Sequence, residues 1–470
     1  MRISREGHLC WKTSNAPSLP ESLLQEGKDL FPTAPVVRQE DRYYLQRNWV
    51  YETHILNQVN RLQSYKPSVP ELLPQGLPLL PHQQEAVEQA IQRSFSLISG
   101  GPGTGKTYTA SFLVKALAAS SPKKGRYKVA LAAPTGKAAS HLQAVLGPVE
   151  AQIEATTLHR LLRITPGITP LFSHRKIDAD LVVVDEASML NVPLLAQLLE
   201  SIGEETRLVL MGDPNQLPPV EAGSLFAEMA ALFGIPLQQP VRTENRRLLA
   251  LAEGIHRGEF TEASHLLNWT FDASLSQKLF TRIAPLISWE EPDPATCLKE
   301  LDTFRILGAL RQGPFGIDAL NQQIVQQMDL LIRLGQWWAI PIMITRNEPR
   351  QELYNGTCGI LIGKSEGGVH FRSATAYFPQ KVPFNALPPF EVAFCLSIHK
   401  SQGSEFERVL ALFPQGSEHF GREAFYTAVT RAKNHVEIAA ENGVLKAMLA
   451  HGSRKTSGFT ERFLLQRNTL

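Results

Sequence analysis

The sequence predicts an α/β protein with two domains built on parallel sheets, a small β insertion in the second domain and a small helical module at the N-terminus. Three observations support this prediction. A chain of 470 residues is too long for one ordinary hydrophobic core. From Phe95 onward, short apolar runs alternate with amphipathic helical segments, which is typical of parallel strands covered by helices. Between Asn347 and Pro389 the pattern is instead punctuated by glycine and β-like.

We expect residues 1–75 to form the N-terminal module and a linker, because they are rich in proline and polar residues. Within them, the stretch 43–62 has the apolar spacing of a helix. The first α/β domain is expected over 76–240, with strand candidates at 95–98, 129–133, 181–184 and 208–211. The second is expected over 241–470, with the insertion at about 347–390 and strand candidates at 304–307, 341–345, 409–413 and 436–439.

Charge, cysteines and hydropathy narrow the class of protein. The formal net charge is only +2, so a nucleic-acid site would have to be a local groove. The four cysteines lie far apart without a CxxC pair, which argues against a zinc site and a disulfide framework and fits a reducing compartment. No apolar stretch follows the first six residues, and none reaches the roughly 20 residues of a membrane-spanning helix. We therefore expect a soluble cytoplasmic protein without a membrane partner.

The strongest motif is Gly100-Gly101-Pro102-Gly103-Thr104-Gly105-Lys106-Thr107, between a predicted strand and a predicted helix. It matches the GxxxxGK[ST] pattern of the phosphate-binding loop in the context that this loop requires. The glycines let successive backbone amides face the phosphates, and the helix N-terminus adds a partial positive charge. Lys106 would reach the β- and γ-phosphates of ATP, and the Thr107 hydroxyl would bind Mg²⁺. The alternative, an ordinary glycine-rich turn, does not account for the lysine and the threonine together.

An acidic pair, Asp185-Glu186, ends the apolar run 181–184. A metal-held triphosphate needs a carboxylate, and its hydrolysis needs a base. Asp185 is therefore predicted to hold Mg²⁺ through water, and Glu186 to activate the attacking water. Taken alone, such a pair is often just a strand ending at the surface. Together with the phosphate-binding loop, it predicts an ATPase site.

Three further segments of the first domain resemble motifs of superfamily 1 helicases. Gly212-Asp213-Pro214-Asn215-Gln216-Leu217 is similar to motif III, which implies that Gln216 contacts the γ-phosphate or the attacking water. Ala133-Pro134-Thr135-Gly136 resembles motif Ia, a loop at a strand end that holds DNA phosphates through backbone amides and a hydroxyl. Thr157-Leu158-His159-Arg160-Leu161-Leu162 resembles motif Ib, another nucleic-acid segment. Individually, each of these segments could be an ordinary βα loop.

Gln83, in Leu80-Pro81-His82-Gln83, resembles the Q motif, whose glutamine recognises adenine through its amide. A glutamine near a helix start is commonly just a cap. The assignment to adenine therefore depends mainly on the position of Gln83 ahead of the phosphate-binding loop.

The second domain extends the helicase resemblance. Ser397-Ile398-His399-Lys400-Ser401-Gln402-Gly403-Ser404-Glu405-Phe406 is similar to the motif V segment of RecD-like helicases. It combines hydroxyl and basic donors for backbone phosphate, namely Ser397, His399 and Lys400, with a turn near the nucleotide at Gly403 and Glu405.

Two arginines are expected to complete the nucleotide site. Tyr426-Thr427-Ala428-Val429-Thr430-Arg431 resembles motif VI, in which Arg431 would touch the γ-phosphate across the domain interface. Arginine suits this role because its charge is permanent and its donors are forked. Val241-Arg242-Thr243-Glu244 fits the position of motif IV, so Arg242 is the preferred second arginine and Arg246 is the alternative.

Three other stretches narrow the resemblance to the RecD family, the alpha subunits of exonuclease V. Residues 41–52 resemble its RxYLxRxWxxE segment, and residues 307–321 resemble LxALRxGPxGxxxLN. Tyr354-Asn355-Gly356 matches a loop that enters the family's SH3-like insertion, and the resemblance places Asn355 among the DNA contacts. Thr357 departs from the pattern, because an aspartate is usual there.

The resemblance implies two RecA-like domains that bind ATP and Mg²⁺ between them, each gripping single-stranded DNA. It further implies a 5′-to-3′ DNA helicase that works with RecB-like and RecC-like subunits on double-stranded DNA ends, with a partner-binding N-terminal module. No separate cluster of carboxylates with a lysine indicates a nuclease. Two alternatives stay open: a stand-alone translocase without such partners, and a DNA-end-binding subunit with a vestigial ATPase. A metabolic P-loop kinase would not need the motif V and VI segments.

Overall fold

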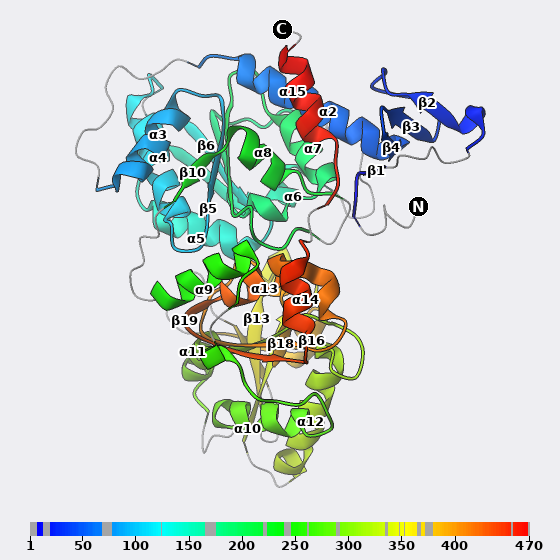
Figure 1. The fold of residues 1–470 in the computed structure, drawn as a ribbon. Helices are drawn as coiled ribbons and strands as arrows, with labels where there is room; N and C mark the ends of the chain where they lie inside the picture. Colours follow the sequence, from blue (N-terminus) through cyan, green and yellow to red (C-terminus); the bar gives the residue numbers. More distant parts are fainter. Residues whose placement is uncertain are drawn as a thin grey trace. The chain divides into compact units, whose positions relative to one another are not determined.

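The computed structural model describes residues 7–12, 19–67, 78–123, 125–164, 175–219, 223–238, 246–260, 263–287, 292–333, 337–346, 348–351, 353–363, 368–371, 379–452 and 455–468. The chain forms two compact units, coloured along the sequence in Figure 1. Unit 1 comprises Met1–Arg242 and Arg454–Leu470, and unit 2 comprises Thr243–Ser453. The second domain was expected to run to residue 470, whereas the structure returns the C-terminal segment to unit 1.

Unit 1 is built on a six-stranded sheet of order β10-β5-β9-β8-β6-β7, in which every pair is parallel. Its strands are β5 (Phe95–Gly100), β6 (Lys128–Ala133), β7 (Gln152–Thr157), β8 (Leu181–Val184), β9 (Arg207–Gly212) and β10 (Ile235–Leu237). The four strands predicted from apolar runs are confirmed. The other two, β7 and β10, are the edge strands, and their sequences lack a long apolar run because an edge is less buried.

Helices cover both faces of this sheet, because alternate strand residues point to opposite faces. Leu97 joins the core beneath α2 (Gln46–Ser64), α7 (Val192–Ser201), α8 (Phe226–Phe233) and α15 (Phe459–Asn468). Ile98 joins the core beneath α3 (Pro81–Ile91), α4 (Lys106–Ser120) and α5 (Gly136–Leu146). A short helix, α6 (Leu158–Leu161), follows β7. Figure 1 shows the blue α2 beside the red α15, so an early helix and the last helix lie in one layer of unit 1.

The N-terminal module was expected to be helical, but its strands within residues 10–45 form a small sheet that precedes the helix α2. Four strands pair in the order β1-β4-β3-β2: β1 (Cys10–Lys12), β2 (Leu24–Glu26), β3 (Val36–Gln39) and β4 (Arg42–Leu45). Strands of three or four residues are too short to show an alternating pattern, so the sequence gives no clear signal for them. The helix expected within 43–62 is present as α2, and its Ile55, Leu56 and Val59 belong to the core of unit 1.

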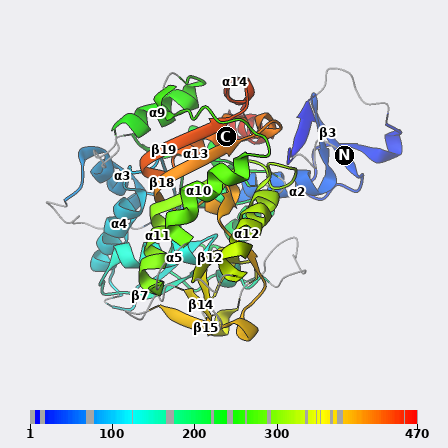
Figure 2. The same cartoon turned by 90° about the horizontal axis from the view of Figure 1, so that it is seen from below.

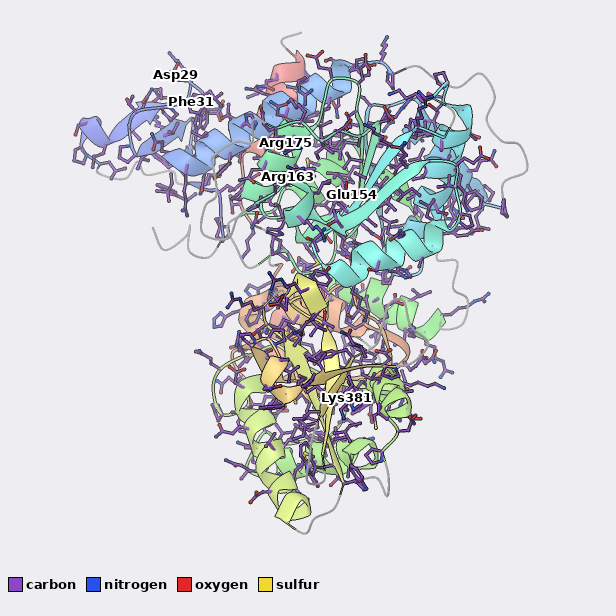
Figure 3. The ribbon with its side chains drawn as sticks, turned by 180° about the vertical axis from the view of Figure 1, so that it is seen from behind. Asp29, Phe31, Glu154, Arg163, Arg175 and Lys381 are labelled. Carbon is purple, nitrogen blue, oxygen red and sulfur yellow. The ribbon has the colours of Figure 1, made fainter. Side chains whose placement is uncertain are left out.

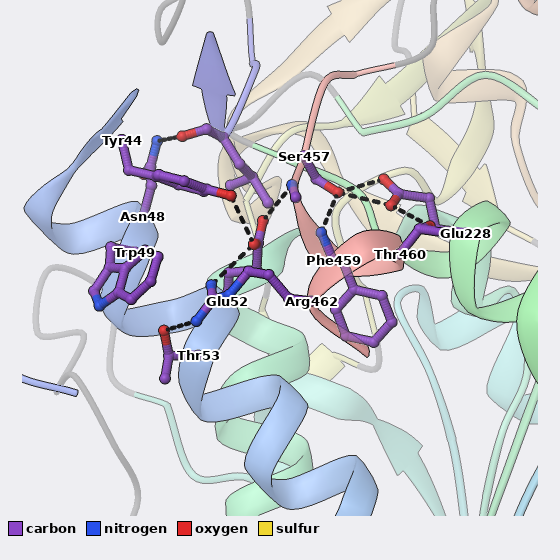
Figure 4. Close-up of polar contacts among 12 residues, drawn as sticks. Tyr44, Asn48, Trp49, Glu52, Thr53, Glu228, Ser457, Phe459, Thr460 and Arg462 are labelled. Atoms are coloured by element: carbon purple, nitrogen blue, oxygen red, sulfur yellow. Dashed lines mark hydrogen bonds and ion pairs between the residues drawn. The ribbon is translucent and has the colours of Figure 1, made fainter. Parts of the chain in front are cut away.

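A buried ion pair fastens α15 to α2 (Figure 4). The fully buried Glu52 carboxylate accepts hydrogen bonds from the Tyr44 hydroxyl at 3.2 Å and from the backbone N–H of Gly458 at 3.1 Å. It also pairs with Arg462 at 3.0 Å, and the guanidinium carbon of Arg462 lies 3.9 Å from the centroid of the Trp49 ring. The aromatic and acidic residues of the 41–52 segment therefore hold the C-terminal helix in place.

A second set of hydrogen bonds links residues 457–460, at the start of α15, to α8 (Figure 4). The Glu228 carboxylate accepts hydrogen bonds from the Ser457 hydroxyl at 2.7 Å and from the Thr460 hydroxyl at 3.1 Å. The chain thus returns to unit 1 through contacts with both α2 and α8.

Unit 2 contains a parallel and an antiparallel sheet. The parallel sheet has the order β17-β11-β18-β19, with β11 (Phe304–Gly308), β17 (Cys395–Ser397), β18 (Phe406–Phe413) and β19 (Ala432–Ala440). The antiparallel sheet has the order β15-β14-β13-β12-β16, with β12 (Trp338–Ile344), β13 (Cys358–Gly363), β14 (Gly368–Phe371), β15 (Gln380–Pro383) and β16 (Phe390–Val392).

The strand predicted at 341–345 belongs to the antiparallel sheet and not to the parallel one. Its residues form β12, which pairs with β13 and β16. A buried strand of either sheet reads as an apolar run, so hydropathy alone could not assign it. The β insertion therefore begins earlier than expected, at Trp338.

Six helices are described in unit 2: α9 (Arg246–Arg257), α10 (Leu275–Ile287), α11 (Pro294–Thr303), α12 (Ile317–Arg333), α13 (Gly421–Val429) and α14 (Val444–Ala450). α10 and α12 share a hydrophobic core with both sheets. α9 packs against α13 and β19, and Figure 2 shows α9 beside β19. Across the described parts of both units, none of the helices is long and apolar enough to cross a bilayer.

Short 3₁₀ helices connect several of these elements. They are η1 (Glu21–Leu23), η2 (Ala187–Met189), η3 (Ala263–His265), η4 (Pro349–Gln351), η5 (Phe384–Ala386), η6 (His399–Ser401) and η7 (Ser417–Phe420). Of these, η6 lies within the predicted motif V segment, and η2 directly follows the acidic pair Asp185-Glu186.

Candidate nucleotide and nucleic-acid site

The phosphate-binding loop connects β5 to α4 in unit 1. Gly103 and Gly105 have φ angles of 71° and 79°, in the left-handed region that favours glycine. A Cβ atom at Gly100 would lie 2.6 Å from the Thr104 hydroxyl oxygen, so a side chain there would disrupt the loop. The Lys106 Nζ donates to the carbonyl oxygens of Gly100 and Gly101, at 2.7 and 2.9 Å. The loop thus combines a tightly curled backbone with a centrally held cation.

Gln83 is buried and both ends of its amide are engaged. Its Oε1 accepts a hydrogen bond from the Leu80 N–H, and its Nε2 donates to the Thr104 carbonyl, each at 3.1 Å. The side chain therefore caps α3 and braces the phosphate-binding loop. Gln83 therefore helps to position the phosphate-binding loop, in addition to the adenine contact that the resemblance implies.

Thr107 and Asp185 are far apart in the sequence and meet in the structure. The Thr107 hydroxyl donates to Asp185 Oδ2 at 3.0 Å, and Asp185 Oδ1 accepts from the Glu186 N–H at 2.8 Å. They meet because the carboxyl ends of parallel strands open at one edge of the sheet, and β9 alone separates β5 from β8. A hydroxyl and a carboxylate oxygen are ligands that Mg²⁺ takes together with water and phosphate oxygens. The pair therefore fits a magnesium ion.

Glu186 has an unusual backbone conformation. Its φ and ψ angles are 52° and 37°, in the left-handed region that glycine favours. A non-glycine residue there costs on the order of 1 kcal/mol or more, and such strain gathers at functional sites. The sharp turn separates Asp185, which faces the phosphate-binding loop, from η2.

Gln216 lies in the loop after β9, and the end of this strand contacts η2. At Gly212 a Cβ atom would lie 2.8 Å from the Ser188 backbone nitrogen, so glycine lets this strand end approach η2. The buried Asp213 carboxylate accepts from the Asn215 N–H at 2.9 Å and from Gln216 Nε2 at 3.5 Å. Gln216 itself is 6% exposed, and within the described residues its Oε1 has no hydrogen-bond partner. A buried acceptor without a partner is costly, so this oxygen is suited to a bound water or ligand.

The motif Ia and Ib segments lie at neighbouring strand ends. β6 and β7 pair in parallel, with Ala133 opposite Thr157. The Thr135 hydroxyl, just after Pro134, accepts from the Ala138 N–H at 3.3 Å, and the Thr157 hydroxyl accepts from the Arg160 N–H at 3.4 Å. Each threonine thus caps the helix that follows it. His159 is exposed in α6.

In unit 2, the predicted motif V and VI segments contact each other. Arg431 is 3% exposed, and its Nη1 donates to the Ser404 carbonyl at 3.1 Å while its Nε donates to the Thr427 carbonyl at 3.3 Å. Gly403 turns the chain with a φ of 71°, directly before Ser404 and Glu405. The two segments expected to face the nucleotide are therefore joined within this unit.

The predicted phosphate donors of motif V follow β17. The Ser397 hydroxyl accepts from the Lys400 N–H at 3.3 Å, and the ring centroid of His399 lies 6.1 Å from that of Phe420. The Lys400 Nζ pairs with Glu391 at 2.5 Å. This carboxylate thus fixes the position of the lysine head group.

Arg311 is a further basic side chain of this surface that no site prediction included. Its Nη2 lies 3.5 Å from the second oxygen of Glu391, so Glu391 bridges Arg311 and Lys400. The available signal was positional, because Arg311 follows the β11 strand end inside the segment similar to the RecD family.

Asn355 lies in an exposed turn between β12 and β13. Gly356 has a φ of 88°, and the Thr357 hydroxyl accepts a hydrogen bond from the Tyr354 N–H at 3.1 Å. A side-chain oxygen that accepts from the backbone is also what an aspartate would provide here. The departure from the family pattern at Thr357 therefore keeps an acceptor in this turn.

The second predicted arginine, Arg242, lies outside the described residues. Arg246, the alternative, is the first residue of α9 and is exposed.

Comparison with known proteins identifies two matching domain families and several similar proteins. The AAA domain family matches residues 83–222, and the UvrD-like helicase C-terminal domain family matches residues 392–438. The chain is 32% identical to the RecBCD enzyme subunit RecD of Mycolicibacterium smegmatis, over 91% of this chain and 83% of that protein. It is 30% identical to the ATP-dependent RecD2 DNA helicase of Deinococcus radiodurans, over 88% of this chain and 57% of that protein. Among solved structures, the Pif1 helicase from Candida albicans matches over 84% of this chain and 100% of its own, with 17% identity and a TM-score of 0.48.

Proposed function

This chain belongs to the RecD family of superfamily 1 helicases, and from that premise we propose that it moves 5′ to 3′ along single-stranded DNA as one subunit of a RecBCD-type complex. Its class, an ATP-dependent DNA helicase, follows from the family. One observation supports the ATPase half of this proposal most directly: Thr107 and Asp185 share a hydrogen bond beside the phosphate-binding loop. In this proposal the protein unwinds broken double-stranded DNA ends in the cytoplasm, together with RecB-like and RecC-like subunits.

Each nucleotide-site residue of unit 1 has a distinct role in this proposal. Lys106 would contact the β- and γ-phosphates, and Thr107 with Asp185 would hold Mg²⁺, which supplies positive charge to the phosphate oxygens. Glu186 would take a proton from the attacking water. The Gln216 Oε1, which has no partner within the described part of the chain, would accept a hydrogen bond from that water.

Unit 2 would complete the site with arginine. Arg431, and Arg242 as the second arginine, would neutralise the charge that develops on the γ-phosphate. The two units would then close when ATP is bound and open when the terminal phosphate leaves. Such gating by a nucleotide converts hydrolysis into movement.

The same cycle requires a grip on DNA in both units. The motif Ia and Ib loops would bind backbone phosphates in unit 1, and Ser397, His399 and Lys400 would do so in unit 2, together with Asn355. Phosphate contacts of this kind do not depend on base sequence, which suits a translocase.

Unwinding of tailed duplexes tests the proposed polarity. The purified protein is expected to hydrolyse ATP faster with single-stranded DNA and to unwind duplexes with a 5′ tail but not those with a 3′ tail. Equal unwinding of both substrates, or a preference for the 3′ tail, would show that the polarity is wrong.

A stand-alone helicase is the second candidate, and the similarity to the RecD2 helicase of Deinococcus radiodurans favours it. Purification of the tagged protein from its own cells separates the two candidates, because RecB-like and RecC-like proteins are expected to copurify. Their absence, with unwinding by the isolated chain, would favour the second candidate. Measurable ATP hydrolysis stimulated by single-stranded DNA would exclude a vestigial ATPase.

A further inference from the structure

A groove in unit 1 lies beside the edge strand β7. It has a volume of about 590 Å³. Its walls are the first residues of β6 and β7, the residues 160–163 at the end of α6, and the residues 175–179 that lead into β8. The groove therefore includes Arg160 of the motif Ib segment and continues beyond that segment to Arg163 and Arg175.

The groove is strongly basic in a chain whose net charge is only +2. Five of its lining side chains are basic and two are acidic. The Lys128 Nζ pairs with Asp178 at 2.6 Å, and the Lys176 Nζ donates to the Glu200 carbonyl at 2.5 Å, so both lysines are partly occupied. Three further basic side chains, those of Arg160, Arg163 and Arg175, also line the groove and are exposed.

These arginines come from two segments that the fold brings to the same place. Figure 3 shows Arg163 next to Arg175, with Glu154 of β7 beside them, and all three line the groove. Guanidinium groups present forked donors that match the oxygens of a phosphate. Arginines from separate segments are thus positioned along one surface, as a phosphate backbone requires.

The backbone at Arg163 gives a second, independent indication. Ile164 N–H donates to the His159 carbonyl at 2.9 Å and Arg163 N–H to the Arg160 carbonyl at 3.0 Å, which is the hydrogen-bond pattern of a Schellman helix end. In this pattern the left-handed residue is usually glycine, yet here it is Arg163, with a φ of 54°. An arginine is less stable than a glycine at this backbone position, so the fold alone does not explain the side chain.

We propose that the groove formed by Arg160, Arg163 and Arg175 binds the phosphate backbone of nucleic acid that continues beyond the motif Ib turn. It would lengthen the stretch of single-stranded DNA that unit 1 occupies. The inference depends on the proposed function, because it takes the DNA at Thr157 and His159 as its starting point. The direct continuity of Arg160 with that turn favours nucleic acid over an acidic peptide as the ligand.

The test uses the full-length protein and two variants, Arg163→Gly and Arg175→Gln. Arg163→Gly separates folding from binding, because glycine relieves the backbone strain while the charge is lost. Single-stranded oligonucleotides of about 8 and about 20 nucleotides would be compared, since the shorter one spans little more than one small site. The matched control is Arg47→Gln. Arg47 is exposed near the start of α2, about 20 Å along this helix from Arg61, which contacts α7.

We expect both variants to bind the longer oligonucleotide about 10-fold more weakly at ~0.15 M salt, and the shorter one like the wild type. Each lost phosphate contact should also reduce the slope of log affinity against log salt by about 0.7. The control should match the wild type in both respects. Arg163→Gly should in addition unfold at a temperature no lower than the wild type.

Three results would overturn the inference. The first is wild-type affinity and salt slope in both variants, and the second is an equal loss in Arg47→Gln. The third is binding of polyglutamate that the substitutions weaken, while the binding of the longer oligonucleotide is unchanged by the same substitutions. A wild-type protein without any ATP hydrolysis stimulated by single-stranded DNA would instead contradict the proposed function.

Discussion

Asp185 and Glu186 are adjacent acids with different surroundings. Asp185 is buried and accepts hydrogen bonds from Thr107 and from the backbone, so both its oxygens are fixed beside the phosphate-binding loop. Glu186 is held in a left-handed conformation one residue later. Because metal ligands must be fixed and a base must reach a water, these surroundings support the metal role for Asp185 and the base role for Glu186.

At this residue, Glu186→Gln should preserve ATP binding and reduce DNA-stimulated ATP hydrolysis by about 10²- to 10⁴-fold, because an amide cannot accept the proton. Steady-state hydrolysis and equilibrium binding of a fluorescent ATP analogue would measure the two effects. Glu204→Gln, at an exposed glutamate, is the matched control. Hydrolysis within threefold of the wild type in Glu186→Gln would assign the base to another residue.

The C-terminal helix α15 shows how one element depends on a few buried polar groups. Its Arg462 side chain is 8% exposed and pairs with Glu52, whose side chain is 0% exposed. Removal of one partner would leave the other charge buried without compensation, which typically costs about 3–5 kcal/mol. Removal of both charges is much less costly, because no unpaired charge remains.

For this element, we therefore expect Arg462→Met to lower the free energy of unfolding of unit 1 by about 3 kcal/mol or more. The double variant with Glu52→Gln should recover a large part of that loss. Urea denaturation followed by circular dichroism would measure both. A loss under about 1 kcal/mol in Arg462→Met would show that the pair does not hold α15.

Glu228 gives the same region a dependence on pH. Burial raises the pKa of this carboxyl above its ordinary value of 4.5, against the opposing effect of the Ser457 and Thr460 hydroxyl donors. Between 4.5 and the raised pKa, the folded protein holds a proton that the unfolded chain has released. The contribution of Glu228 to stability therefore falls as the pH rises through this window.

Comparison with Glu228→Gln isolates this effect, because glutamine does not titrate. Urea denaturation of both proteins between pH 4.5 and 7 should show the wild type losing stability relative to the variant as the pH rises. A difference that is constant, or that moves in the opposite direction, would contradict the raised pKa.

At the scale of the whole molecule, the sequence predicts those features that a short local pattern of residues specifies. Buried parallel strands such as β5 and β8 read as apolar runs, and the phosphate-binding loop has its own signature. The short strands of the N-terminal sheet lack such a pattern, and β12 has a pattern that both kinds of sheet share. The return of α15 to unit 1 depends on contacts between residues about 400 positions apart, such as Glu52 and Arg462, which no local pattern encodes.

In the candidate site, too, some residues are marked by a local sequence motif and others depend on neighbours that only the fold supplies. Thr107 and Asp185 could be named from their motifs, because strand ends of a parallel sheet meet at one edge. Arg311 and Arg160 lie inside segments that resemble family motifs, but nothing in the sequence distinguishes them, or Arg163 and Arg175, from ordinary surface arginines. Their significance comes from neighbours that the fold supplies, Glu391 in one case and the segment 175–179 in the other.

The central proposal is that Arg431 acts on the nucleotide that the phosphate-binding loop binds. Its most direct test is the turnover of ATP in the presence of single-stranded DNA by Arg431→Ala and Arg431→Lys, together with their affinity for ATP. Circular dichroism would check that loss of the contact with Ser404 leaves the fold intact. We predict near-normal nucleotide binding with turnover reduced by about 10³-fold or more. Full turnover in Arg431→Ala would contradict the claim.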